Sequence, residues 1–200
     1  MLDRNFFRED TLLVTKKLLG KVLVRKIGKV ELRARIVETE AYLGINDRAC
    51  HTFNDNKTDR NKIMYMDGGT VYVYQTYGIH FLLNIISSRK EVPEGVLIRA
   101  VEPLDNFDIF SMNRFNKKFE NLSAYQRKNL TNGPAKLTKA LKIDKSFNGR
   151  DIFSDKLYID CAKEDFEIVE SKRIGIDYAK EARDYLYRFY IKNNSYVSKL

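Results

Sequence analysis

Apolar and polar residues alternate with a period of two along much of the first half of the chain, a pattern typical of strands with one buried face. The longest such run extends from Val30 to Tyr42. Gly28-Lys29 separates it from a shorter run and predicts a hairpin turn. The predicted strands are Lys21–Ile27, Val30–Tyr42, Val71–Tyr77, Ile79–Ser87, Val96–Val101, Leu157–Cys161, Glu167–Glu170 and Tyr187–Ile191.

Helical segments are predicted before and between these strands. Asp10 can cap a first helix, which Gly20 terminates. The predicted helices are Thr11–Leu19, 104–116, 121–130, 134–142 and a short one near Asp177–Arg183. Strands in hairpin order with inserted helices favour an α+β fold. We expect a curved antiparallel or mixed sheet with surrounding helices and a hairpin, turning at Gly78, that protrudes from it.

The length of 200 residues suits one domain, and no repeat or linker divides residues 1–200. No stretch approaches the roughly 18 consecutive apolar residues of a membrane span. The charged segment Met1–Asp10 lacks the apolar run of a signal peptide. We therefore expect no membrane partner and a location where the chain is made, which in a bacterium is the cytoplasm and its nucleoid.

Cysteine and histidine are scarce. The chain has two cysteines, Cys50 and Cys161, and two histidines, His51 and His80. These are too few for a disulfide framework, and their spacing does not match a zinc site. We expect neither a metal nor an organic cofactor.

The chain is basic, with 36 lysines and arginines against 27 acidic residues and a net charge of +9. Residues 151–200 carry 9 basic and 10 acidic groups, so the excess lies in residues 1–150. A basic body indicates a polyanionic partner, most often a nucleic acid. The alternative is a charged surface that serves only solubility.

One face of the predicted strand Val30–Tyr42 is apolar for four positions and then presents Glu38, Glu40 and Tyr42. Carboxylates at the end of an inward face are costly unless they are paired. They indicate a pocket at the end of the strand, where a carboxylate could act as a general base. The alternative is that both glutamates pair with arginines as the strand leaves the core.

Four of the twelve tyrosines fall within thirteen residues. They are Tyr65, Tyr72, Tyr74 and Tyr77. Tyr77 lies at the tip of a predicted hairpin, where an aromatic ring can act as a wedge between stacked bases. Neighbouring tyrosines can stack on an exposed base. Tyr72 is interpreted as a core residue of its strand.

Distinctive segments follow one another along nearly the whole chain. They are Arg35-Ile36-Val37-Glu38-Thr39-Glu40-Ala41-Tyr42-Leu43-Gly44, Ala49-Cys50-His51, Arg60-Asn61, Gly69–Gly78, Asn84, Leu97–Leu104, Gly133–Leu137, Lys145–Phe147, Arg173–Ile176 and Arg188–Tyr190. In this combination and order the chain resembles the alkyladenine DNA glycosylase family, the mammalian type of 3-methyladenine DNA glycosylase. The resemblance implies a monomeric enzyme of base excision repair that needs no cofactor.

The resemblance also implies the reaction. The enzyme would flip an alkylated or deaminated purine out of double-stranded DNA and hydrolyse its N-glycosidic bond, leaving an abasic site. Glu40 matches the general base that activates water, and Arg99 matches a residue near it that helps to hold the water and the backbone. Glu38 belongs to the same motif, with a structural role expected.

The substrate-binding residues follow from the same resemblance. Tyr42, His51 and Tyr74 match the residues that enclose the flipped base. Tyr77 matches the wedge that fills the vacated place in the stack. Asn84 matches the pocket residue that disfavours guanine.

Two features near the pocket depart from the family pattern. Cys50 stands where a small residue is more usual, and segment Thr52–Asp59 is acidic and rich in asparagine. Two other functions stay open. One is a non-catalytic DNA-binding module, against which the pair Glu40 and Arg99 argues. The other is a glycosylase-lyase with a lysine nucleophile such as Lys136, although a phosphate contact is the simpler interpretation of that lysine.

Overall fold

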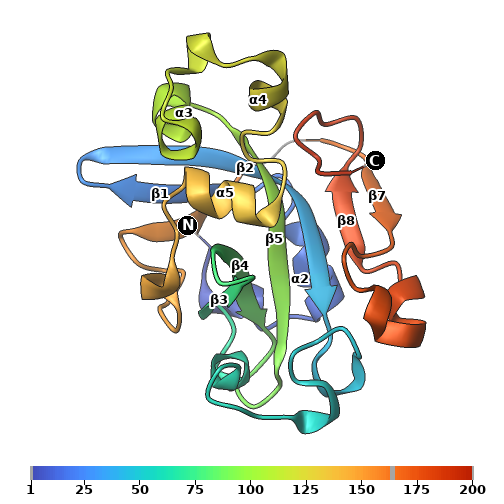
Figure 1. The fold of residues 1–200 in the computed structure, drawn as a ribbon. Helices are drawn as coiled ribbons and strands as arrows, with labels where there is room; N and C mark the ends of the chain where they lie inside the picture. Colours follow the sequence, from blue (N-terminus) through green and yellow to red (C-terminus); the bar gives the residue numbers. More distant parts are fainter. Residues whose placement is uncertain (1, 163–164, 200) are drawn as a thin grey trace.

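The longest predicted strand, β2 (Val30–Tyr42), is central to the observed sheet. The computed structural model describes residues 2–162 and 165–199. In these residues eight strands form one antiparallel sheet in the order β3-β4-β5-β2-β1-β6, and β8 pairs with both β2 and β7. The long strands β2 and β5 run through the molecule, with β7 and β8 beside one end of β2 (Figure 1). The α+β prediction is confirmed.

The strands match their predicted ranges to within one or two residues. Besides β2 they are β1 (Val22–Ile27), β3 (Val71–Thr76), β4 (His80–Ser87), β5 (Glu94–Pro103), β6 (Leu157–Asp160), β7 (Ile168–Ser171) and β8 (Arg188–Ile191). The helices are α1 (Arg4–Phe7), α2 (Thr11–Lys17), α3 (Phe107–Phe115), α4 (Ala124–Lys128) and α5 (Pro134–Ala140), with 3-10 turns η1 (Gly44–Asn46), η2 (Phe53–Asp55), η3 (Lys62–Tyr65), η4 (Phe119–Asn121), η5 (Lys145–Phe147) and η6 (Asp177–Asp184).

Helix boundaries depend on their capping residues. Asp10 caps α2 as predicted, its side chain accepting a hydrogen bond from the Leu13 amide at 2.9 Å. The predicted helix 121–130 is shorter, because Ser123 and Gln126 form a capping box that starts α4 at Ala124. The predicted helix 104–116 starts late as well, at Phe107, because its N-cap Asn106 has a left-handed backbone (φ 46°) that a helix cannot include.

The turn between β3 and β4 is longer by two residues than predicted. Thr76 pairs with His80, so Tyr77 and Ile79 belong to the turn and not to the strands. Tyr77 and Gly78 both adopt positive φ angles, 51° and 69°. Tyr77 is 89% exposed and Ile79 72% exposed. The protruding shape expected of this hairpin stays a prediction.

Helices cover the sheet on both sides. In Figure 1, α5 lies in front of the sheet, where it contacts β4 and β5, while α2 lies behind β2 and β5. The hydroxyl of Thr39 donates to the Thr15 carbonyl of α2 at 3.0 Å. The face of β2 that begins with Glu31 and Arg33 therefore also becomes buried, from Val37 onward. None of the helices in the described residues has the length and apolar character that a membrane span needs.

Two opposed irregularities interrupt the pairing of β2 with β5. Ile36 pairs with Val101 and Glu38 with Ala100, so Val37 is an extra residue on β2. Thr39 then pairs with Ile98, which makes Arg99 an extra residue on β5. The second bulge restores the register that the first one shifted. Bulges redirect side chains locally, and these two lie beside the predicted general base.

Candidate active site

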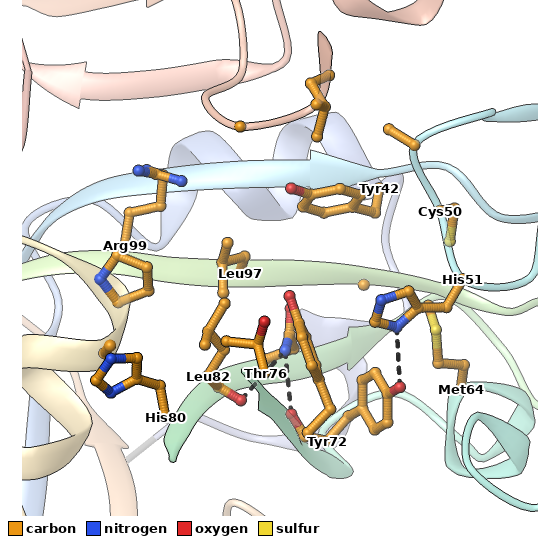
Figure 2. A pocket seen from close by; sticks show the side chains of 18 of the residues that line it. Tyr42, Cys50, His51, Met64, Tyr72, Thr76, His80, Leu82, Leu97 and Arg99 are labelled. Carbon is orange, nitrogen blue, oxygen red and sulfur yellow. Dashed lines mark hydrogen bonds between the residues drawn. The ribbon is translucent and has the colours of Figure 1, made fainter. Parts of the chain in front are cut away.

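A cavity of about 440 Å³ opens where β2, β3, β4 and β5 meet the loops after β2 and β7 (Figure 2). Six of the seven residues that the sequence assigns to the site line it. They are Tyr42, His51, Tyr74, Tyr77, Asn84 and Arg99. The seventh, Glu40, has no exposed surface and lies directly behind the wall that Tyr42 and Arg99 form.

Three donors hold the carboxylate of Glu40. The Tyr42 hydroxyl donates to Oε2 at 2.9 Å, and the Ile174 backbone amide donates to Oε1 at 2.8 Å. Arg99 Nη1 lies 3.2 Å from the same Oε1. An ionised carboxylate has about four acceptor positions. Glu40 therefore keeps one position, on the Tyr42 side, for a further donor such as water.

Arg99 bridges the two glutamates of the motif. Its Nε donates to Glu38 Oε1 at 3.1 Å, while Nη1 faces Glu40. The charges of both glutamates raise the pKa of the Arg99 guanidinium, although its burial acts in the opposite direction. Both glutamates thus pair with an arginine, as the alternative interpretation of this strand expected. The same pairing places one of them beside a cavity.

Tyr42 is held from behind by a buried ion pair. The guanidinium of Arg173 lies 4.8 Å from the centre of the Tyr42 ring and forms two hydrogen bonds with Asp47, at 2.5 and 2.8 Å. Burial and the charge of Glu40 raise the pKa of the Tyr42 phenol well above its usual range. Tyr42 therefore stays protonated and serves as a donor to Glu40.

His51 is anchored by Tyr72, whose hydroxyl lies 3.0 Å from Nδ1 (Figure 2). The rings of His51 and Tyr74 meet edge to face, with centroids 4.6 Å apart. Desolvation by the surrounding protein and the charge of Arg60 lower the pKa of His51, while burial raises that of Tyr72 to about 12. At neutral pH both groups are uncharged, so they give this side of the cavity an aromatic wall, beside which Arg60 supplies a positive charge.

Asn84 lies deep in the cavity and Tyr77 at its edge. The amide nitrogen of Asn84 donates to the Tyr72 carbonyl at 3.2 Å, which fixes the side chain on β4. Tyr77 lines the cavity from the β3–β4 turn and extends into solvent. The structure therefore brings all seven predicted site residues together around one cavity.

The Lys136 amine and the Cys50 thiol are both held by neighbouring groups. The amine of Lys136 donates to the Asn129 and Asn132 side chains at 2.7 and 2.8 Å. Cys50 lines the cavity, but it is buried and burial raises the pKa of its thiol. Within the described part of the chain, no three His, Cys, Asp or Glu side chains gather in a way that could hold a metal ion.

Sequence reasoning missed three contributors to the site. Tyr72 was interpreted as a core residue, and it is 2% exposed, but its hydroxyl also positions His51. Asp47 and Arg173 form a buried pair behind Tyr42. The only sequence signal for Arg173 was its place in the segment Arg173–Ile176.

A cavity with aromatic walls and a buried carboxylate behind one of them suits a hydrolase that acts on an aromatic ring compound. The sequence pattern of the methylpurine-DNA glycosylase family matches residues 5–195, and the chain belongs to this family. It is a DNA N-glycosylase of base excision repair that acts on damaged DNA, as the resemblance predicted.

Similar bacterial proteins extend over the whole chain. A protein of Clostridium novyi (strain NT) is 58% identical over 198 residues, covering 99% of this chain and 98% of the relative. One of Clostridium perfringens (strain SM101 / Type A) is 54% identical, with 99% and 98% coverage. One of Clostridioides difficile (strain 630) is 47% identical, with 96% and 100% coverage. All three are named as 3-methyladenine DNA glycosylases.

Proposed function

We propose that this enzyme removes alkylated purines of the 3-methyladenine type from double-stranded DNA, with Glu40 as its general base. The observation that carries the proposal is the environment of Glu40: a fully buried carboxylate held by three donors, from Tyr42, Arg99 and Ile174, all of which line the cavity. The names of the bacterial relatives support the choice of substrate.

Binding would require the damaged nucleotide to rotate out of the helix. That rotation costs a few kcal/mol, and less when the base is damaged. Stacking on Tyr42 and Tyr74 would return about 1–3 kcal/mol per aromatic contact. Tyr77 would enter the gap left in the stack, since its ring is almost entirely exposed at a turn.

Base release would pass through an oxocarbenium-like sugar, as in glycoside hydrolysis. An ionised Glu40 would stabilise that charge and take a proton from the attacking water. Arg99 would hold Glu40 in place. A base such as 3-methyladenine carries positive charge while attached and leaves as a neutral molecule, so it needs no proton donor.

Asn84 would select the base. Its amide is fixed by the Tyr72 carbonyl, so it cannot swing away from a purine in the cavity. The 2-amino group of guanine would collide with it, whereas adenine has no group there. Adenine-derived lesions would therefore be favoured over guanine-derived ones.

Other parts of the proposal concern the setting of the reaction. We expect the enzyme to act as a monomer, because all seven site residues come from one chain. Its DNA substrate would place it at the nucleoid of a bacterial cell. A lyase step by Lys136 is disfavoured, since its amine is bound to Asn129 and Asn132.

The test uses a panel of duplexes, each with one modified purine, scored for free base under single-turnover conditions. Wild-type enzyme should release an alkylated adenine, and Glu40→Gln should bind the same duplex but release almost none. Binding without release by the wild-type enzyme would indicate a non-catalytic module. A covalent adduct trapped by borohydride on the abasic product would indicate a lyase.

A further inference from the structure

Four buried side chains of alternating charge connect the cavity with the C-terminal part of the chain. Arg188 Nη1 lies 2.8 Å from Glu38 Oε1, and Arg99 Nε lies 3.1 Å from the same oxygen. Arg99 Nη1 continues the series to Glu40. The side chains of Glu38 and Glu40 have no exposed surface, and those of Arg99 and Arg188 are 9% and 6% exposed. The proposed reaction uses Glu40 and Arg99 and leaves Glu38 and Arg188 without a role.

Glu38 differs from Glu40 in how completely it is hydrogen-bonded. Besides the two arginines, the Ser198 hydroxyl donates to Oε1 at 2.9 Å and the Ser198 amide donates to Oε2 at 2.7 Å. Glu38 thus has four donors, three on Oε1 and one on Oε2, one more than Glu40 has. None of these four contacts comes from a group of the substrate-binding set, so Glu38 is held by the C-terminal part of the chain and by Arg99. Its charge is available only to the two arginines.

The two bulges explain how Arg99 reaches both carboxylates. Arg99 is the extra residue on β5, opposite the stretch of β2 that carries the bulge at Val37. A bulge changes the direction of its side chain relative to the regular pleat. The guanidinium can therefore donate through Nε to Glu38 and present Nη1 to Glu40.

We propose that Glu38 is a positioning residue that shares the charge of Arg99 with Glu40 and thereby sets the pH range in which Glu40 acts as a base. The proposal rests on the function proposed above for Glu40. The positive charge of Arg99 favours the ionised form of Glu40, whereas the like charge of Glu38 on the same guanidinium disfavours it. Arg188 and Ser198 in turn determine how much Glu38 depends on Arg99.

The other groups that face Glu40 are the same in every variant of the test. They are the Tyr42 hydroxyl, the Ile174 amide and, at longer range, the charge of Arg173 and the uncharged phenol of Tyr74. Differences between variants of Glu38, Arg188 and Ser198 therefore report on how Glu38 and its partners act on Glu40.

The experiment measures the single-turnover release of an alkylated adenine from a duplex as a function of pH. In Glu38→Gln, Arg99 keeps Glu40 as its one anionic partner. The acidic limb of the pH–rate profile should therefore move to lower pH by about half a unit or more. In Arg188→Met, Glu38 loses one of its two arginine partners and its negative charge is less compensated. The acidic limb of the pH–rate profile should therefore move to higher pH. Ser198→Ala, the mildest change, should move it up by less.

The opposite directions separate this proposal from a structural role. If all three variants lose rate while the limb stays in place, or if all limbs move the same way, the proposal is wrong. Should Glu38→Gln fail to fold, an unmoved limb in both Arg188→Met and Ser198→Ala overturns it equally.

A matched control, Glu102, lies on β5, the strand that also carries Arg99. Glu102 of β5 pairs with Arg35 and Asn194 outside the cavity, so Glu102→Gln should leave the profile unchanged. Failure of the proposed function gives a different result. In that case the wild-type enzyme would release no base at any pH.

Discussion

The hydroxyl of Tyr42 donates a hydrogen bond of 2.9 Å to the carboxylate of Glu40, two residues earlier on the same strand. The same tyrosine lines the cavity and lies in front of the Arg173 guanidinium. One side chain therefore joins the proposed base-binding surface to the proposed general base. Placement of the substrate and orientation of the carboxylate depend on the same ring.

Tyr42→Phe tests this double role. The ring remains, so binding of a lesion duplex should change little, but the carboxylate loses one of its three donors. We expect single-turnover excision to fall about tenfold, which corresponds to a hydrogen bond of ~1.4 kcal/mol to a charged group. Rates and affinities measured on one duplex check this. An equal loss of both would show that the hydroxyl supports the pocket as a whole.

Tyr77→Ala and Asn84→Ala should fail in different ways. Loss of the exposed Tyr77 ring should weaken flipping of every lesion, most for stably paired ones.

Loss of the Asn84 amide should raise the rate on a guanine-derived lesion relative to an adenine-derived one. Single-turnover rates of both variants on both lesions are needed. An unchanged ratio for Asn84→Ala, or unchanged rates and binding for Tyr77→Ala, would contradict the assigned role.

Asp47→Ala should be strongly destabilising. Asp47 is 2% exposed and is the anionic partner of Arg173, whose side chain is fully buried. Without it the guanidinium remains as an uncompensated buried charge, which costs about 3–5 kcal/mol of the free energy of unfolding. Urea unfolding measures the loss. Glu181→Ala, which removes an exposed partner of Arg48, is the control and should change stability much less.

The lowered pKa of His51 makes stability depend on pH. Unfolded histidine titrates near about 6.5, so below that pH the unfolded chain binds a proton that folded His51 does not yet bind. This contribution to the free energy of unfolding is constant above about pH 6.5 and is lost as the pH falls toward the folded pKa. His51→Asn should therefore lose less stability on acidification than wild type does. Urea unfolding at neutral and mildly acidic pH checks the difference, and equal losses would contradict it.

DNA affinity should depend strongly on salt. Each phosphate that a lysine or arginine neutralises contributes roughly −0.9 to the slope of log affinity against log salt. The excess of positive charge in residues 1–150 predicts several such contacts. Titration of an undamaged duplex at several salt concentrations measures the slope. A flat dependence would mean that the basic surface does not bind the phosphate backbone.

The sheet was largely predictable because its strands alternate clearly. The range Val30–Tyr42 was predicted without error, and the turn at Gly28-Lys29 is where the sequence indicates it. The bulges at Val37 and Arg99 were not foreseen, since neither position carries the glycine that often indicates one. Sequence periodicity describes a regular pleat and does not locate its interruptions.

The site was predictable where a motif carried it and unpredictable where it depends on distant contacts. Tyr72 illustrates the limit: alternation indicates that a residue is buried, but not what its polar atom binds. The pairing of Asp47 with Arg173 joins positions 126 residues apart. No local pattern in a single sequence reports such a contact.

The separation between Glu38 and Arg188, 150 residues, has a consequence for protein synthesis. On the ribosome, β2 emerges long before β8, the strand that covers its edge from Glu38 to Glu40. Until β8 arrives, Glu38 lacks Arg188 and the two carboxylates have Arg99 of β5 as their common cation, so this edge of β2 stays incompletely paired and open to water. Closure of this edge of the sheet therefore waits for β8. Translation that stops before β8 would leave an open, charged strand edge as a target for proteolysis instead of a partly active repair enzyme.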